Sequence, residues 1–187
     1  ECLQVFDEAA KSFPEGIHYK NLVNANVFLD ESIEKILRTL LEAFILVFIV
    51  VYLFLQDFRS TLIPAISVPV AIVGTFFFLY LFGFSINLLT LFALLLAIGI
   101  VVDDAIVVVE AVHAKLDQKY PSALKASVDA MGEITPAIVS ITLVMASVFI
   151  PVTFITGSSG VFYKQFGVTL AIAIILSAVN ALTLSPA

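Results

Sequence analysis

Residues 88–110 read LLTLFALLLAIGIVVDDAIVVVE. Up to Val109 this stretch contains no acidic or basic side chain except the adjacent pair Asp103 and Asp104. A helix needs about 20 predominantly apolar residues to cross the roughly 30 Å hydrocarbon layer of a bilayer, and residues 88–109 meet that length. The stretch therefore predicts a transmembrane helix that carries two carboxylic acids, and with it an all-α membrane protein.

Composition supports the membrane class and excludes several others. Of the 187 residues, 61% are hydrophobic and 13% charged, against roughly 45–50% and about 25% in soluble domains. Cys2 is the single cysteine beside two histidines, so we expect no disulfide framework, no metal site and no cofactor. The net charge of −6 argues against nucleic acid as a partner. Four further apolar stretches bring the predicted transmembrane helices to five, at about 37–55, 62–82, 88–109, 136–155 and 166–184.

The chain divides into a short polar part and a membrane part. Residues 1–30 are polar and too short to fold alone, so we expect the end of a soluble domain, followed by the membrane region 31–187. Its loop at 110–135 predicts a short amphipathic helix after Pro121. Arg59 and the lysines of that loop predict the cytoplasmic side, because basic residues favour it. Residues 1–30 would then lie outside the cytoplasm. The first residue is Glu1 rather than Met, and we expect an internal part of a longer protein.

Asp103 and Asp104 are the predicted functional residues. A carboxylate at a helix centre costs about 2.5–3.5 kcal/mol on insertion scales, which favours a functional reason for keeping two. Asp103 lies on the order of 10 Å along the helix from its end at Glu110, well inside the hydrocarbon layer. Burial and mutual repulsion disfavour the charged forms of Asp103 and Asp104 there, so we expect the pair to load and release a proton. Glu42 is a possible accessory acid, and Gly99, one turn before Asp103, would let another helix approach closely.

Three motifs resemble the resistance-nodulation-division (RND) efflux transporters, especially their multidrug branch. They are FLQDFRSTLIP at 54–64, AIGIVVDDAIVVVE at 97–110, and FIP at 149–151 with GSSGVFYKQF at 157–166. Their order and spacing cover most of the chain from Ile33 onward. One departure is Ala111, where the family usually has asparagine.

The resemblance implies a secondary active transporter rather than an enzyme: a proton antiporter, driven by the proton motive force, that exports hydrophobic or amphiphilic compounds. It implies that Asp103 and Asp104 are the proton relay, partnered by a lysine in the second half of the same chain. The five spans would be the second to sixth of twelve helices, after the end of a periplasmic α+β pore domain at 1–30. It further implies a homotrimer in a bacterial inner membrane, with a periplasmic adaptor protein and an outer-membrane channel.

Two other functions compete with this interpretation. A membrane subunit for lipid or protein translocation could have the same fold. An intramembrane aspartyl protease also uses two buried acids, but it needs them on facing helices that share one proton. Here the two acids are adjacent on one helix and point about 100° apart.

Overall fold

The computed structural model describes residues 5, 9, 14, 25–118 and 122–186, without the side chains of residues 25–29 and 158. Its regular elements are five α-helices, and the described part of the chain contains no strand. All five contain a stretch long and apolar enough to cross a membrane. They are α2 (Ala25–Leu55), α3 (Phe58–Leu81), α4 (Leu88–Asp117), α5 (Ala123–Val152) and α6 (Ser158–Thr183).

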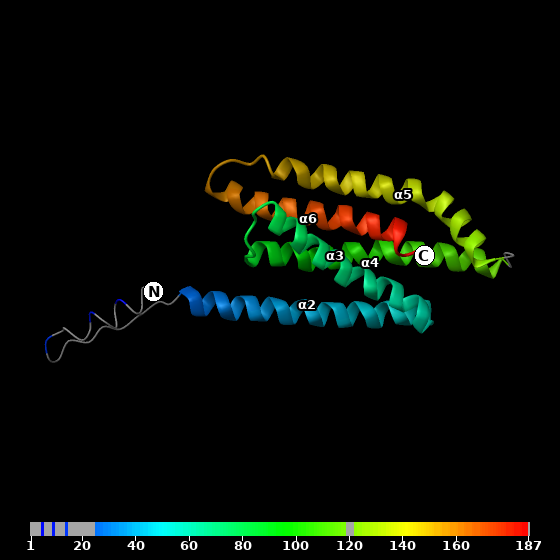
Figure 1. Ribbon diagram of the computed structural model, residues 1–187, viewed down its shortest axis with the longest axis horizontal. Helices are drawn as coiled ribbons and strands as arrows, with labels where there is room; N and C mark the ends of the chain where they lie inside the picture. The colour runs from blue at the N-terminus through cyan, green and yellow to red at the C-terminus, as the bar shows by residue number, and fades with distance from the viewer. Residues whose placement is uncertain (1–4, 6–8, 10–13, 15–24, 119–121, 187) are drawn as a thin grey trace.

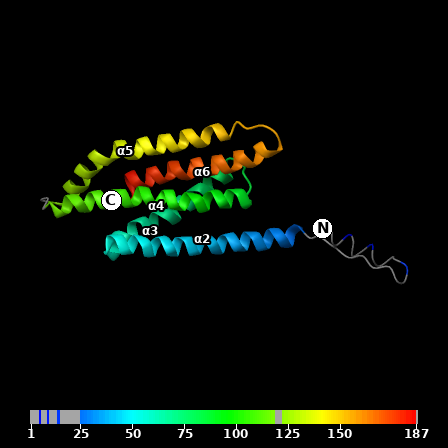
Figure 2. The same ribbon diagram turned by 180° about the vertical axis from the view of Figure 1, so that it is seen from behind.

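The helices form a bundle arranged around α4. Figures 1 and 2 show α5 and α6 on one side of α4 and α2 on the other, and α3 runs obliquely past α4 from the end of α2 to α6. Among the described residues α4 contacts all four other helices, whereas α2 contacts only α3 and α4. The connection at 56–57, the end of α4 and the start of α5 lie at one end of the bundle, which we call the Arg59 end. The connections at 82–87 and 153–157 lie at the other, the Lys164 end.

Local sequence explains where three of the helices begin. Asp57, Asn87 and Ser122 precede α3, α4 and α5, and each side chain accepts a hydrogen bond from a backbone N–H of the first turn. Such caps satisfy donors that have no partner within the helix. Gln56 has a φ of +49°, and this left-handed residue turns the chain sharply between α2 and α3.

The predicted all-α membrane fold and its five spans are confirmed, but the helices extend beyond the spans. α5 begins at Ala123, which agrees with the helix expected after Pro121. α4 continues to Asp117, so the predicted loop 110–135 is mostly helical and only 118–122 separate the two helices. α2 starts at Ala25, so residues 25–30, expected in the soluble part, are also helical. Nearly all the rest of the predicted soluble segment 1–30 lies outside the described residues.

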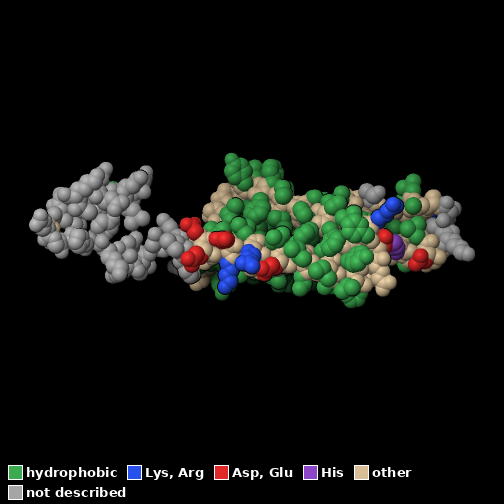
Figure 3. All heavy atoms as spheres, turned by 90° about the horizontal axis from the view of Figure 1, so that it is seen from below, with side chains coloured by type: hydrophobic (Ala, Val, Ile, Leu, Met, Phe, Trp, Pro, Cys, Tyr) green, Lys and Arg blue, Asp and Glu red, His purple; other side chains and the backbone are tan. Residues whose placement is uncertain are grey.

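The bundle buries few of its apolar side chains and exposes many. Figure 3 shows a broad hydrophobic band with acidic and basic side chains gathered toward its two ends, the pattern of a surface in contact with lipid. The tightest packing joins α4 to α6, where Ala93, Ala97, Leu170, Ala173 and Ile174 are all buried. Small side chains at this contact let the two backbones approach closely.

Candidate proton-binding site

Helix α4 carries both predicted aspartates and is anchored at its start. Asn87 and Thr90 form a reciprocal capping box, and the Asn87 side-chain amide also donates to Gln165 of α6. No proline interrupts α4 between Leu88 and Asp117. The aspartates therefore lie on one continuous helix at the centre of the bundle.

Asp104 faces α6 and is buried there, with 6% of its surface exposed. Ser177 of α6, itself 1% exposed, places its hydroxyl oxygen 2.5 Å from Asp104 Oδ2. A hydroxyl can donate to an ionised carboxylate or accept from a protonated one. The pair can therefore keep its hydrogen bond in either protonation state of Asp104.

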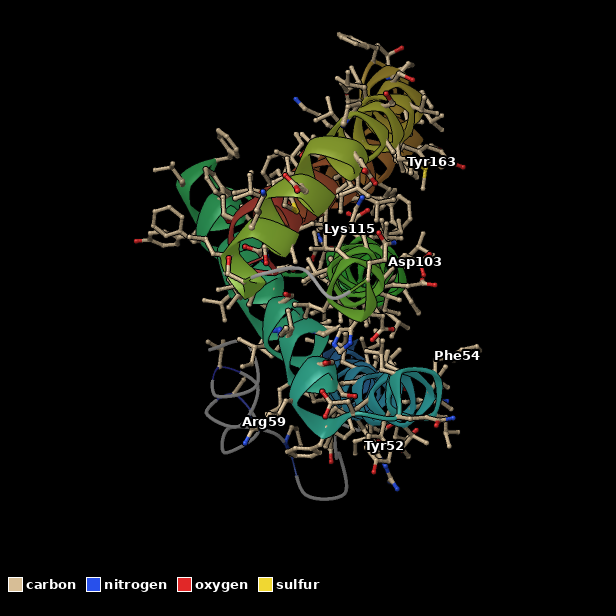
Figure 4. The ribbon with its side chains drawn as sticks, turned by 90° about the vertical axis from the view of Figure 1, so that its right-hand side faces the viewer. Tyr52, Phe54, Arg59, Asp103, Lys115 and Tyr163 are labelled. Atoms are coloured by element: carbon tan, nitrogen blue, oxygen red, sulfur yellow. The ribbon has the colours of Figure 1, made fainter. Side chains whose placement is uncertain are left out.

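Asp103 faces a different surface. Its side chain is exposed in the bundle and lies on the flank of α4 away from α3, on the same side as Phe54 of α2 (Figure 4). A groove of about 400 Å³ between α2 and α4 has Asp103 in its wall and Glu110 one to two turns further along. Its other lining residues are apolar: Val50, Val51, Phe54, Leu55 and Ile106. The two adjacent acids thus have unlike surroundings.

The predicted accessory residues are not brought into this site. Glu42 forms an ion pair with Arg38, one turn away on α2, at 3.1 Å. It lines a separate groove on α2 that contains neither aspartate. No heavy atom outside α4's own nearby backbone lies within 4 Å of the place that a Cβ would take at Gly99, so the expected close helix approach is not made by any described residue.

Ser177 is the site residue that the sequence analysis did not single out, because serine is common between membrane helices. A signal was present: Thr169, Ala173 and Ser177 follow one another at intervals of four residues, so they form a small, partly polar stripe on one face of α6. That stripe predicts a close helix contact but does not identify Asp104 as the partner. Among the described residues no group of three His, Cys, Asp or Glu side chains could hold a metal ion.

Comparison with known proteins gives a consistent result. The sequence model of the AcrB/AcrD/AcrF family matches residues 2–187. The multidrug export protein AcrF of Escherichia coli K12 is 47% identical over 176 residues, and the multidrug resistance protein MdtF of the same strain is 45% identical over 175. The toluene efflux pump membrane transporter TtgE of Pseudomonas putida is 45% identical over 174 residues.

These alignments cover 93–94% of this chain but only 17% of each of the three relatives. The chain thus spans about a sixth of the length of the curated relatives it matches. Its motifs, its five apolar helices and the match over residues 2–187 agree. The chain belongs to the AcrB/AcrD/AcrF family of multi-pass RND membrane transporters.

Proposed function

We propose that this chain is part of a proton-driven antiporter that exports hydrophobic or amphiphilic compounds, with Asp103 and Asp104 as its proton relay. The observation that carries the proposal is the hydrogen bond from buried Ser177 to buried Asp104 between two membrane-spanning helices. The names of the relatives, which describe multidrug export and toluene efflux, support the export of apolar compounds.

Burial makes the charge of Asp104 costly and its protonation useful. An isolated carboxylate at a helix centre costs about 2.5–3.5 kcal/mol on insertion scales, and the Ser177 hydroxyl offsets part of that cost only while the two helices stay in contact. A proton that binds Asp104 removes the charge and changes the hydrogen bond from charge-assisted to neutral. The contact between α4 and α6 is therefore weaker in one protonation state than in the other.

The available driving force is large enough for such a change. One elementary charge that crosses 100 mV releases about 2.3 kcal/mol, and one pH unit adds about 1.36 kcal/mol per proton. A charge-assisted hydrogen bond contributes about 1.5–3 kcal/mol. Proton loading at Asp104 can thus shift a packing equilibrium of similar size.

The two acids have different roles in this proposal. Asp104 is coupled to α6 through its hydrogen bond with Ser177, whereas Asp103 lines the groove between α2 and α4. Asp103 is therefore the acid that a cation from the second half of the chain would reach. The basic residues at the Arg59 end support a cytoplasmic position for that end. The same proposal includes the remaining expectations: a bacterial inner membrane, a homotrimer, a periplasmic adaptor protein, an outer-membrane channel and a periplasmic position for residues 1–30.

The test measures drug export in cells that carry the full-length protein as wild type, Asp103→Asn or Asp104→Asn, at matched membrane abundance. Asn keeps the size of Asp but cannot carry the proton, so each variant should lose export while it still assembles. Asp117→Asn is the matched control, because Asp117 is an exposed acid at the end of the same helix. Normal export in both relay variants would refute the proposal.

A further inference from the structure

A second hydrogen-bonded contact joins α4 to another helix, here α3, and it lies nearer the Arg59 end than the aspartate pair does. His113 Nε2 of α4 lies 2.6 Å from the hydroxyl oxygen of Ser60 in α3. The same Ser60 oxygen lies 2.6 Å from Asp57 Oδ2, which also accepts the Ser60 backbone N–H at 2.9 Å. Ser60 is 6% exposed and His113 is exposed, so this part-buried contact lies at the edge of the α3–α4 packing and joins two residues 53 apart in sequence.

The protons of this contact can be assigned by counting donors. The hydrogen bonds from Ser60, first through its side chain and then through its backbone, hold the pKa of Asp57 below its ordinary value, so Asp57 is ionised and can only accept. Ser60 has one hydroxyl proton, and Asp57 takes it. The Ser60 oxygen is left as an acceptor toward His113, which must therefore carry a proton on Nε2. Both the neutral Nε2–H tautomer and the imidazolium satisfy this requirement.

The position of His113 on α4 gives the contact its significance. His113 follows Asp104 by nine residues, which is about two and a half turns or roughly 13 Å along the axis. The two side chains therefore leave α4 on opposite faces, Asp104 toward Ser177 of α6 and His113 toward Ser60 of α3. Two contacts on opposite faces oppose rotation of α4 about its axis. Asp103, next to Asp104, is thereby kept toward the groove between α2 and α4.

We infer that His113 and Ser60 are positioning residues, which hold the rotation of α4 so that Asp104 faces α6 and Asp103 faces the groove. The inference rests on the proposed relay for its functional meaning, but its geometry can be tested separately. It assigns the two residues a role that does not depend on whether His113 is charged. Loss of the His113 donor should let α4 rotate and should make the surroundings of the two acids more alike.

The readout is the rate at which a hydrophobic carbodiimide modifies each aspartate in the full-length protein in its native membrane. In the wild type Asp103 should react faster than buried Asp104. His113→Leu keeps the bulk of the side chain but has no donor, and it should lower the Asp103 to Asp104 rate ratio by about two- to twelve-fold, the factor that a typical net hydrogen bond contributes. His113→Gln, which retains a terminal N–H donor, should restore the wild-type ratio.

Val108→Ala is the matched control for general loosening, because Val108 is a fully buried apolar residue of α4. It should leave the rate ratio close to that of the wild type. An unchanged ratio in His113→Leu, or equal changes in the Leu and Gln variants, would overturn the inference. Normal export in Asp103→Asn and Asp104→Asn would instead refute the relay, and the rate ratio would still report whether His113 holds the helix.

Discussion

Replacement of Ser177 by alanine removes the hydroxyl that donates to Asp104 Oδ2 at 2.5 Å. The change is small and lies in a contact where both residues are buried, so the helices should still assemble. Its main effect should fall on the protonation equilibrium of Asp104, because the lost hydrogen bond is stronger with an ionised acceptor than with a neutral acid.

The expected change in the protonation equilibrium of Asp104 follows from the strength of the lost hydrogen bond. A bond to a charged group contributes about 1.5–3 kcal/mol and a neutral one about 0.5–1.5 kcal/mol, so between the matching ends of these ranges the two forms of Asp104 differ by about 1–1.5 kcal/mol. Polar contacts between membrane helices average about 0.6 kcal/mol and reach about 1.7, and a buried charged contact should lie in the upper part of that range. At about 1.36 kcal/mol per pH unit, Ser177→Ala should move the relay-dependent limb of the export–pH profile upward by about 0.7 unit.

Export measured across pH in membrane vesicles with an imposed gradient would test this value. Ser177→Thr keeps the hydroxyl and should leave the profile near that of the wild type. Ser140→Ala is a matched control, because Ser140 is exposed and, within the described part of the chain, its hydroxyl donates to the Pro136 carbonyl of its own helix alone. A profile for Ser177→Ala that overlies the wild type would refute the role given to this hydrogen bond, as would an equal shift in the Ser140 control.

Two further predictions concern the helix ends. Gly160→Ala would place a Cβ in steric conflict with the carbonyl oxygen of Ile155, whereas a Cβ at Gly132 meets nothing within 4 Å. We expect Gly160→Ala to lower the amount of protease-resistant protein in the membrane and Gly132→Ala to stabilise α5 by roughly 0.5–1 kcal/mol. Equal effects of the two changes would contradict this. Hydrogen bonds from Ser60 depress the pKa of Asp57 in the folded protein below the ordinary 3.8. The helix cap, in which the Asp57 carboxylate accepts the Ser60 backbone N–H, should therefore be fully formed above pH 3.8. It should be lost only as the pH falls through the lower pKa of the folded protein. The hydrogen-exchange protection of the Ser60 amide should therefore be constant from about pH 8 to 5 and drop in Asp57→Ala; a decline over that range in the wild type would count against the cap.

Hydropathy predicted the five helices because the thickness of a bilayer sets a minimum apolar length. It did not predict where the helices end, because a helix continues into water wherever polar residues with good helix propensity follow. Residues 110–117 and 123–135 show this: they contain Lys115 and Glu133, which form an ion pair between α4 and α5 at 2.5 Å. That pairing joins residues 18 apart and stabilises helical structure outside the apolar core.

The candidate site was predictable in part for a similar reason. Asp103 and Asp104 are conspicuous because any acid within a span is costly, and the structure shows that they have different surroundings. Ser177 was not identifiable, because its partner lies 73 residues earlier and only the packing of α4 against α6 joins the two. Serine is common between membrane helices, so residue type alone does not separate a partner of the relay from an ordinary helix contact.

The length of α2 has a mechanical consequence. Its 31 residues span about 46 Å, roughly 16 Å more than the hydrocarbon layer. Its neighbours among the described residues are α3 and α4, and a short turn at Gln56 and Asp57 joins it to α3. If α2 pivots at that turn, a tilt of only about 10° displaces its far end by roughly 8 Å, since the displacement grows with the length of the arm. A side-chain adjustment of an ångström or less beside the pivot is thus enlarged several-fold at the first turn of the helix.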